Sequence, residues 1–306
     1  MSIFKLENSK LFEIKEKKID LERDIQKITE ESLSTIFGLE LIGTEFPLHN
    51  SRIDTLAFDK ETNSFVIIEY KRDRNFSVID QGYSYLALLL NNKADFILEY
   101  NEKMKNSLKR DDVDWSQSKV IFVSPNFTTY QRGAMDFKDM PFELWEVRMY
   151  ENNLVEYKEL KPASNSETIK TVSKNKVIAE VSKEVREYTV DEHFKPDWQE
   201  SKAIFEILSE RLLSLDSRLE ENPQKYYIGY KIGRKNIFGV DVRKSFINFS
   251  ITRTLPSELK DPLKRTTLRK NSMKFYGQNI TDFHVDNAED VDYAMMLARQ
   301  ALERVQ

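Results

Sequence analysis

The sequence predicts an α/β protein of two domains, in which a mixed β-sheet flanked by helices is followed by a smaller α+β unit. Three observations support this fold class. The chain has 306 residues, which is longer than a usual single domain. Its first half alternates between helical patterns and short strand-like runs, and its second half has aromatic-rich strands. A stretch rich in Ser, Thr and Lys separates the halves, so we expect a first domain at 1–160, a linker at 161–190 and a second domain at 191–306.

The first domain is expected to begin with an amphipathic helix, because apolar residues recur at near-helical spacing between charged ones. Asn75 or Ser77 can cap the next helix, which continues through an apolar segment to Asn92. A polar stretch at 101–118 is expected to form a loop. The expected elements are a helix at 19–36, strands at 39–46, 53–58 and 65–71, a helix from about 77 to 92, a strand at 120–125, a short helix at 128–137 and a strand at 143–150. This order predicts a mixed sheet and not a doubly wound array.

The second domain is expected to combine helices with strands that are rich in aromatic residues. The expected elements are a helix near 197–215, strands at 225–232, 236–242 and 246–254, and a final helix at 288–305. This mixture predicts an α+β unit, and the preceding linker leaves room for a short helix.

Composition excludes several chemistries. The chain contains no cysteine, which removes disulfides, thiolate zinc sites, iron–sulfur ligation and a cysteine nucleophile. Neither a Gly-x-Gly-x-x-Gly nor a Gly-x4-Gly-Lys-Ser/Thr loop is present, so we expect no nucleotide cofactor bound in such a loop. The formal net charge of −4 does not indicate a nucleic-acid binder, although a local basic groove can coexist with an acidic surface.

The ends and apolar runs of the chain predict a cytoplasmic protein without a membrane segment. The amino terminus, MSIFKLENSK, lacks the apolar core of a signal peptide. The longest uncharged apolar run lies within 81–92, which is too short to span a bilayer.

Charged residues interrupt the most strand-like segment of the chain, SRIDTLAFDKETNSFVIIEYKRDRN at 51–75. Side chains alternate along a strand, so Glu69 and Lys71 point to the same side and Tyr70 to the other. A turn centred between residues 61 and 62 places Asp54 opposite Glu69, with β-carbons about 5 Å apart. A turn shifted by one residue would place Asp54 opposite Tyr70, so the strand register decides whether the carboxylates meet.

Two carboxylates at this distance repel each other, and this repulsion raises the pKa of one of them unless a cation lies between them. Hard oxygen ligands without nearby histidine or thiolate favour Mg²⁺, with Mn²⁺ as a substitute. Such an ion keeps positions for water and for phosphate oxygens. An ammonium close by, supplied by Lys71, can orient a metal-bound water and offset phosphate charge.

The pattern Asp54…Glu69-Tyr70-Lys71 resembles the D…(D/E)-x-K signature of the PD-(D/E)xK nuclease superfamily, with Ile53 in place of the usual proline. The next helix carries Gln81 and Tyr85, similar to the Q-x-x-x-Y motif of the RecB-like branch. The segment LERDIQ resembles the start of the first helix in these relatives. The run RIDTLAFD…VIIEYKR…VIDQGYSYL is most similar to the NucS-like group, and the second domain resembles an uncharacterised domain that often follows this nuclease domain.

The resemblance implies a restriction-endonuclease-like core with a metal-dependent active site. Asp54, Glu69 and the Tyr70 carbonyl would hold Mg²⁺, and Glu22 is the candidate helix carboxylate that approaches it. Lys71 would position the attacking water, and Gln81 would steady the lysine or the scissile phosphate. A solvated helical face remains an alternative for Glu22, and a packing or capping role remains one for Gln81.

Other residues are candidates for contact with nucleic acid. Arg52, Arg72 and Arg74 flank the motif and could each meet a phosphate, although each could also be an ordinary surface charge. Tyr85 could belong to the site or to the core. Basic stretches at 103–110, in the loop that we expect beside the site, and at 260–274 could extend the track by backbone attraction, with solvated loops as the alternative.

These observations predict a Mg²⁺-dependent deoxyribonuclease, and more specifically an endonuclease, that acts on DNA in restriction, repair or phage defence. Two alternatives stay open. One is a catalytically dormant nuclease fold that binds DNA or scaffolds a partner, and the other is a second domain that reads the target for the first. Cutting of both strands would require two active sites, which a homodimer would supply.

Overall fold

A computed structural model defines the fold, and the structure describes residues 2–19, 21–48, 51–72, 77–133, 140–161 and 176–304, without the side chains of residues 274 and 275. The chain forms two compact units, Met1–Arg186 and Glu187–Gln306. The boundary therefore falls later than the expected end of the first domain at residue 160. The reason is helix α6 (Lys176–Glu184), which lies within the expected linker 161–190 but buries Ile178 and Val181 in the core of the first unit.

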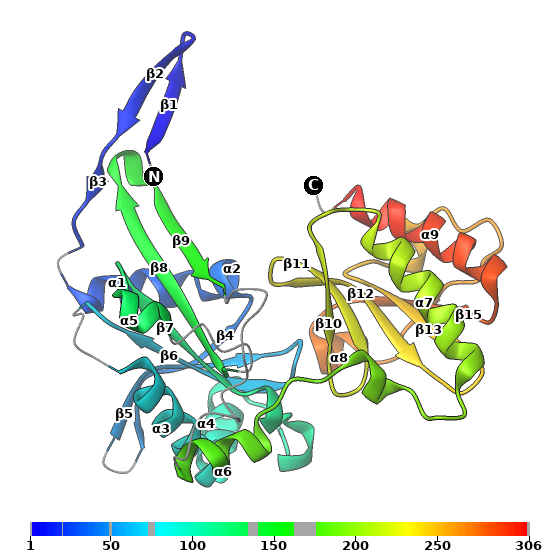
Figure 1. Cartoon of the computed structure of the whole chain (residues 1–306), viewed down its shortest axis with the longest axis horizontal. Helices are drawn as coiled ribbons and strands as arrows, with labels where there is room; N and C mark the ends of the chain where they lie inside the picture. The colour runs from blue at the N-terminus through cyan, green and yellow to red at the C-terminus, as the bar shows by residue number, and fades with distance from the viewer. Residues whose placement is uncertain are drawn as a thin grey trace. The chain divides into compact units, whose positions relative to one another are not determined.

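The first unit is built on a seven-stranded mixed sheet with the order β3–β8–β7–β6–β5–β4, and β9 also pairs with β8 (Figure 1). Strands β6, β7 and β8 are parallel to one another, and the remaining pairs are antiparallel. The strands are β3 (Glu16–Lys17), β4 (Glu40–Leu48), β5 (Ser51–Asp59), β6 (Ser64–Tyr70), β7 (Lys119–Ser124), β8 (Phe142–Tyr150) and β9 (Val155–Leu160). Strand β9 was not predicted.

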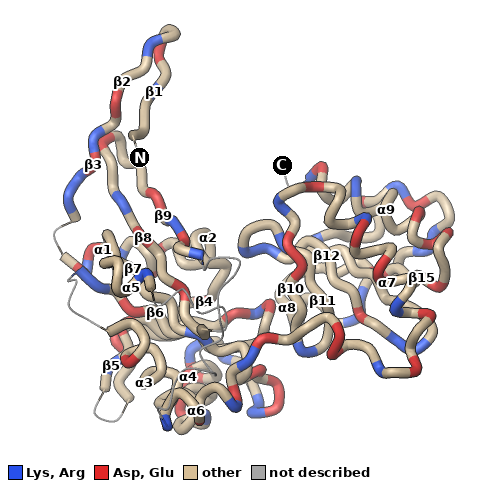
Figure 2. The backbone as a smooth tube through the Cα atoms, in the orientation of Figure 1, with Lys and Arg blue, Asp and Glu red and all other residues tan. Residues whose placement is uncertain are grey.

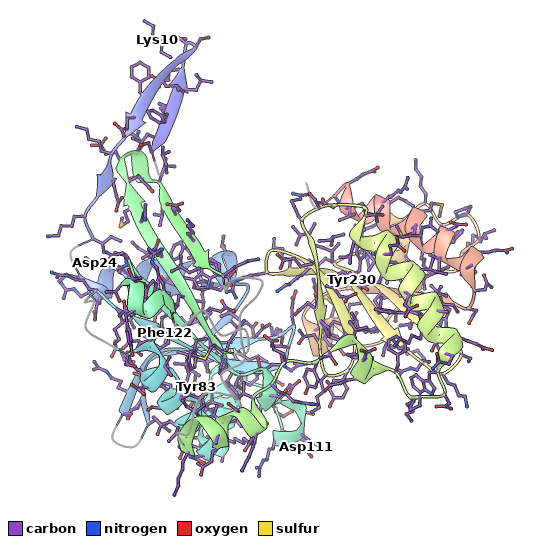
Figure 3. All side chains as sticks on the ribbon, in the orientation of Figure 1. Lys10, Asp24, Tyr83, Asp111, Phe122 and Tyr230 are labelled. Carbon is purple, nitrogen blue, oxygen red and sulfur yellow. The ribbon has the colours of Figure 1, made fainter. Side chains whose placement is uncertain are left out.

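Helices cover both faces of this sheet. On one face, α1 (Glu22–Glu31) and α2 (Leu33–Phe37) pack over β-strand residues that include Ile68 and Val123. On the other, α3 (Val78–Asn91), α4 (Lys93–Met104) and α6 enclose a second core. Figure 3 labels two members of that core, Tyr83 of α3 and Phe122 of β7. Both cores depend on the alternation of apolar residues along the central strands.

The expected helices are interrupted in the structure. The helix predicted at 19–36 is two helices, because the chain leaves helical geometry at Ser32 and α2 ends at Gly38 in the left-handed conformation. The helix predicted at 77–92 is followed at once by α4, so the first residues of the expected loop 101–118 are helical. The short helix predicted at 128–137 is α5 (Thr129–Gly133), and its last residues lie outside the described part of the chain.

An amino-terminal hairpin was not predicted. Strands β1 (Ile3–Glu7) and β2 (Lys10–Ile14) form a separate two-stranded sheet that stands away from the main sheet of its unit (Figure 1). Its exposed side chains include Leu6 and Leu11, which lie opposite each other. A sheet of two strands buries few side chains, so its sequence has no clear alternation of apolar and polar residues from which a strand could be predicted.

The second unit is a six-stranded antiparallel sheet with the order β10–β11–β12–β13–β15–β14. Helices α7 and α9 pack on one face and bury Leu208, Phe238 and Leu297 together. The elements are α7 (Gln199–Leu213), β10 (Leu219–Pro223), β11 (Ile228–Ile232), β12 (Lys235–Val242), β13 (Ile247–Thr252), β14 (Thr267–Leu268), α8 (Ser272–Tyr276), β15 (Ile280–Val285) and α9 (Ala288–Leu302).

Short 3₁₀ helices complete both units, at Arg110–Asp112, Trp115–Gln117, Glu151–Asn153, Val190–His193 and Pro256–Glu258. The two units confirm the predicted fold class, since a mixed sheet flanked by helices is followed by an α+β unit. In the described part of the chain, no helix is long and apolar enough to cross a membrane.

Candidate active site

The register of the β5–β6 hairpin brings the predicted carboxylates together. The strands pair from Asp59–Ser64 to Thr55–Ile68. The same register, continued by one position, places Asp54 opposite Glu69. The turn is therefore centred between residues 61 and 62, as predicted, and the alternative with Asp54 opposite Tyr70 is excluded.

The two strands part directly after this pair. The Tyr70 backbone N–H donates a hydrogen bond to Asp54 Oδ2 at 3.0 Å, where a regular ladder would use a strand carbonyl. Lys71 N–H donates instead to the Val123 carbonyl on β7 at 2.9 Å. The Tyr70 N–H of β6 therefore fixes the Asp54 carboxylate at the point where β5 and β6 separate.

Glu69 is buried, with only 3% of its surface exposed. Its Oε1 accepts hydrogen bonds from Lys71 Nζ at 2.6 Å and from Gln81 Nε2 at 3.4 Å. Its Oε2 is buried and has no hydrogen-bond partner among the described residues. An acceptor without a donor is costly inside a protein, so this oxygen calls for a positively charged ligand or water.

Helix α3 supplies the amide and the phenol of the site. Ser77 Oγ caps the helix by accepting a hydrogen bond from Asp80 N–H at 3.2 Å. One turn later, Gln81 Nε2 lies 3.5 Å from Tyr85 OH. Gly82 lets α3 approach the sheet closely, since a β-carbon there would lie 2.6 Å from the ring of Phe142. This close packing brings Gln81 within reach of Glu69.

Burial dominates the electrostatics of the site. It raises the pKa of Asp54, which the charges of Glu45 and Glu22 raise further, while the Tyr70 N–H and the charge of Lys71 oppose the shift. Burial also raises the pKa of Glu69, and the charge of Asp54 adds to the effect. The pKa of Tyr85 is raised as well, by burial and then by Glu69, so its hydroxyl stays protonated. A divalent cation between the carboxylates would relieve this repulsion.

The donor set fits Mg²⁺ or Mn²⁺. Asp54 and Glu69 offer hard carboxylate oxygens, and the unpaired Glu69 Oε2 is available to a cation. Glu22 is the first residue of α1, and its Oε1 accepts the Arg72 backbone N–H at 2.6 Å. Among the described residues, no three His, Asp or Glu side chains form a group that could hold a metal ion. The candidate metal site therefore depends on the Asp54 and Glu69 carboxylates together with water. That Glu22 and the Tyr70 carbonyl also ligate the metal stays a prediction.

Two residues near the site were missed from the sequence. Glu45 of β4 stands opposite Asp54, between the Thr44–Thr55 and Phe46–Ile53 pairs, and its φ of 52° is left-handed. Gln26 of α1 donates through Nε2 to the Asp54 carbonyl at 3.0 Å. Glu45 gave no signal beyond one charge near a strand end, and Gln26 could have been noticed only as the last residue of LERDIQ.

The predicted arginines are in different situations. Arg52 is exposed and pairs through Nε with Glu45 Oε2 at 2.6 Å. Arg72 is also exposed, next to the site through its backbone bond to Glu22. Arg74 lies outside the described residues.

The basic stretch at 103–110 does not lie beside the site, contrary to our expectation. It follows α4 toward the other end of the strands, where Tyr100 packs on Phe58 and Asp114 N–H donates to the Asn63 carbonyl in the β5–β6 turn. The α4 helix, which the sequence did not predict there, carries the stretch away. In the stretch at 260–274, Arg265 and Arg269 form ion pairs with Asp290 and Asp282 of the second unit.

Comparison with known proteins identifies a relative along the whole chain. An uncharacterized protein of Haemophilus influenzae is 42% identical over 305 residues, which cover 99% of this chain and 100% of the relative. The chain belongs to the same family as that protein. No protein-family model matches the chain.

Solved structures match only a part of the chain. A structure of an EndoMS–dsDNA2 complex is 18% identical over 42% of this chain and 47% of that chain, with a TM-score of 0.29. A repair endonuclease from Pyrococcus abyssi is 19% identical over 40% of this chain and 45% of that chain, with a TM-score of 0.23. The chain thus spans less than half of these solved chains, and its fold is defined by the strand order and packing described above.

Proposed function

We propose that the chain is a Mg²⁺-dependent nuclease that hydrolyses DNA phosphodiester bonds at the site formed by Asp54, Glu69, Lys71 and Gln81. One observation carries this proposal. The β5–β6 register and α3 bring two buried carboxylates, an ammonium and an amide to one point, and one carboxylate oxygen there lacks a donor. A buried carboxylate oxygen of this kind is suited to a cation or to an ordered water.

Each side chain has a role that its contacts support. Asp54, fixed by the Tyr70 N–H, and Glu69, through Oε2, would hold the cation. When bound, a divalent cation lowers the pKa of a ligated water and stabilises charge on a phosphate. Lys71 Nζ, held by Glu69 Oε1 at 2.6 Å, would orient the attacking water. Gln81 would fix the same carboxylate oxygen and through it the lysine.

The polar residues around this centre would bind the substrate. Arg52 and Arg72 are exposed beside the site, and their guanidinium groups suit the oxygens of a phosphate. Tyr85 OH lies near Gln81 and Glu69, so it would help to keep the site ordered. The acidic residues Glu22 and Glu45 would oppose the approach of the polymer, and a bound cation would reduce this repulsion without being required for binding.

A cleavage assay tests the proposal. Supercoiled plasmid, duplex oligonucleotides and single-stranded oligonucleotides are incubated with the full chain and Mg²⁺ or Mn²⁺, beside Asp54→Ala and Lys71→Ala. We expect the wild type to cut at least one substrate and both variants to lose the activity. Intact substrates throughout, or variants that cut as well as the wild type, would rule the proposal out.

A dormant nuclease fold that only binds DNA is the second candidate. The complete set of Asp54, Glu69 and Lys71 at one point disfavours it, because a fold that had lost catalysis would be free to lose any of them. Salt-sensitive DNA binding without cleavage under any metal would favour it. A reading role for the second unit is separable, since deletion after Arg186 would then remove target choice and leave cutting intact.

A further inference from the structure

A second charged cluster lies on the same sheet face as Glu69, two strands away. Tyr70 pairs with Val123 in β7, and Ser124 pairs with Glu146 in β8. Paired residues of neighbouring strands share a face, so Lys71, Ser124 and Glu146 follow one another at the carboxyl ends of the parallel strands. Two strand spacings separate Lys71 from Glu146, which is about 10 Å. Ligands of open α/β sheets usually bind at this edge.

Glu146 is a buried carboxylate, only 2% exposed, that holds two arginines. Its Oε1 pairs with Arg132 Nη2 from α5. Its Oε2 lies 3.5 Å from Arg148 Nη2, two residues further along β8. Figure 2 shows basic positions on both α5 and β8. A carboxylate this deep in the protein needs a cationic partner, and Glu146 has two.

The arginines present part of their guanidinium groups outward. The Arg132 side chain is 48% exposed, although Nε donates to the Phe127 carbonyl at 3.2 Å and Nη2 to Glu146. These two bonds use two of its five N–H donors. The Arg148 side chain is 27% exposed, and the nearby charge of Glu16 compensates it in part. Arg132 is therefore the stronger anion-binding group of the pair.

We propose that Arg132, supported by Arg148 and oriented by Glu146, binds a backbone phosphate of the DNA strand that is cut at Asp54 and Glu69. The inference rests on the proposed function and extends it, because it gives the substrate a second anchor along the carboxyl edge of β6, β7 and β8. On the neighbouring strand β9, Lys158 is exposed and stands opposite Glu146, and Glu156 stands opposite Arg148. Glu146 touches no phosphate in this account and acts as a positioning residue.

The rigid placement of Arg132 matters for this role. A guanidinium that is already held by a carboxylate loses little side-chain entropy when it meets a phosphate, and its fork can bind two oxygens at once. Lysine would retain the charge but not the fork. A contact of this kind fixes the register of the strand and carries no sequence information.

Binding of a labelled DNA duplex in EDTA, measured as a function of salt, tests the proposal with Arg132→Ala, Arg132→Lys and Glu146→Gln. Lys119→Ala is the matched control, since Lys119 pairs with Glu143 at 2.7 Å at the amino end of the same two strands. We expect Arg132→Ala to weaken DNA binding about 10-fold. The negative slope of log K against log salt should become shallower by about one. Arg132→Lys should keep the slope and lose part of the affinity, and Lys119→Ala should match the wild type.

An Arg132→Ala variant that is folded by circular dichroism and keeps wild-type affinity and slope overturns the inference, and so does an equal loss in Lys119→Ala. If Arg132→Ala does not fold, Arg132→Lys decides by the same affinity comparison. Glu146→Gln should weaken binding without changing the slope, and unchanged binding in that variant overturns its positioning role. The two failures are distinguishable: normal DNA cutting by Arg132→Ala removes the phosphate anchor alone, whereas Arg132-dependent binding without any cutting removes the nuclease alone.

Discussion

The Tyr70 backbone N–H binds Asp54 Oδ2 at 3.0 Å, and this bond marks the point where β5 and β6 separate. The same strand continues its ladder with β7 through Lys71 N–H. Asp54 is thus held by main chain on one side of the gap, while Glu69 and Lys71 occupy the other. The candidate metal site therefore lies where the regular pairing of β5 and β6 ends, beside the Asp54 and Glu69 carboxylates.

The first prediction concerns stability in the absence of metal. The folded-state pKa of Glu69 lies above its ordinary value, so the folded protein binds its proton more tightly than the unfolded chain does. The unfolding free energy contributed by this group therefore falls as the pH rises from about 4 through the folded pKa. At neutral pH in EDTA, Glu69→Gln should raise the Tm by a few degrees in calorimetry.

Cation binding should reverse that difference. Mg²⁺ should raise the Tm of the wild type but not that of Glu69→Gln, and the gain should fade as the pH drops and protons compete. Glu143→Gln serves as the control, because Glu143 pairs with Lys119 at the other end of the strands. If Mg²⁺ raised the Tm of Glu69→Gln as much as that of Glu143→Gln, Glu69 would not be a ligand of the cation.

The second prediction separates catalysis from metal binding. Lys71 Nζ pairs with Glu69 Oε1, so Lys71→Ala removes the amine and leaves Asp54 and Glu69 Oε2 in place. We expect the cleavage rate to fall at least about 100-fold, in the range of a lost proton-transfer or water-orienting group. The Mg²⁺-induced Tm shift should persist. Loss of both properties would mean that the lysine is structural.

The third prediction concerns the phenol on α3. Tyr85→Phe removes a hydroxyl that lies 3.5 Å from Gln81 Nε2, so cleavage should slow about 5-fold, as expected for about 1 kcal/mol. Tyr83→Phe is the matched control, because its hydroxyl faces Met140 in the core. Single-turnover rates should separate the two variants, and equal rates would assign Tyr85 to packing.

The fourth prediction concerns the packing of α3. In Gly82→Ala, the added methyl group would lie 2.6 Å from the buried ring of Phe142. We expect a loss of about 1–3 kcal/mol in the free energy of unfolding from this overpacking. Gly43→Ala meets only contacts of 3.6 Å or more and should change stability less. Urea denaturation of the two variants measures the difference.

Much of the site could be predicted from the sequence, because it depends on local rules. The four-residue turn at 60–63 fixed the register, strand alternation placed Glu69 and Lys71 together, and helical spacing brought Gln81 and Tyr85 to one side. These inferences involve neighbouring segments only. The division of the chain into a mixed-sheet unit and an α+β unit followed equally from the order of periodic patterns.

The rest depends on contacts between distant segments. Glu45 meets Asp54 through the β4–β5 register and a left-handed residue, and Arg132 meets Glu146 only after β7 and β8 are aligned. Helix α6 was assigned to a linker because its composition is polar, but its two buried side chains complete the first core. The β1–β2 hairpin exposes apolar residues, and no pattern in the sequence distinguishes it from a loop.

Anomalous diffraction from a crystal soaked in Mn²⁺ tests the central claim most directly. The account predicts a peak bonded at about 2.1 Å to Asp54 and to Glu69 Oε2, and no peak in Glu69→Gln crystals treated identically. A soaked wild-type crystal with no peak between these carboxylates, or with Lys71 Nζ occupying the position of the ion, would contradict it.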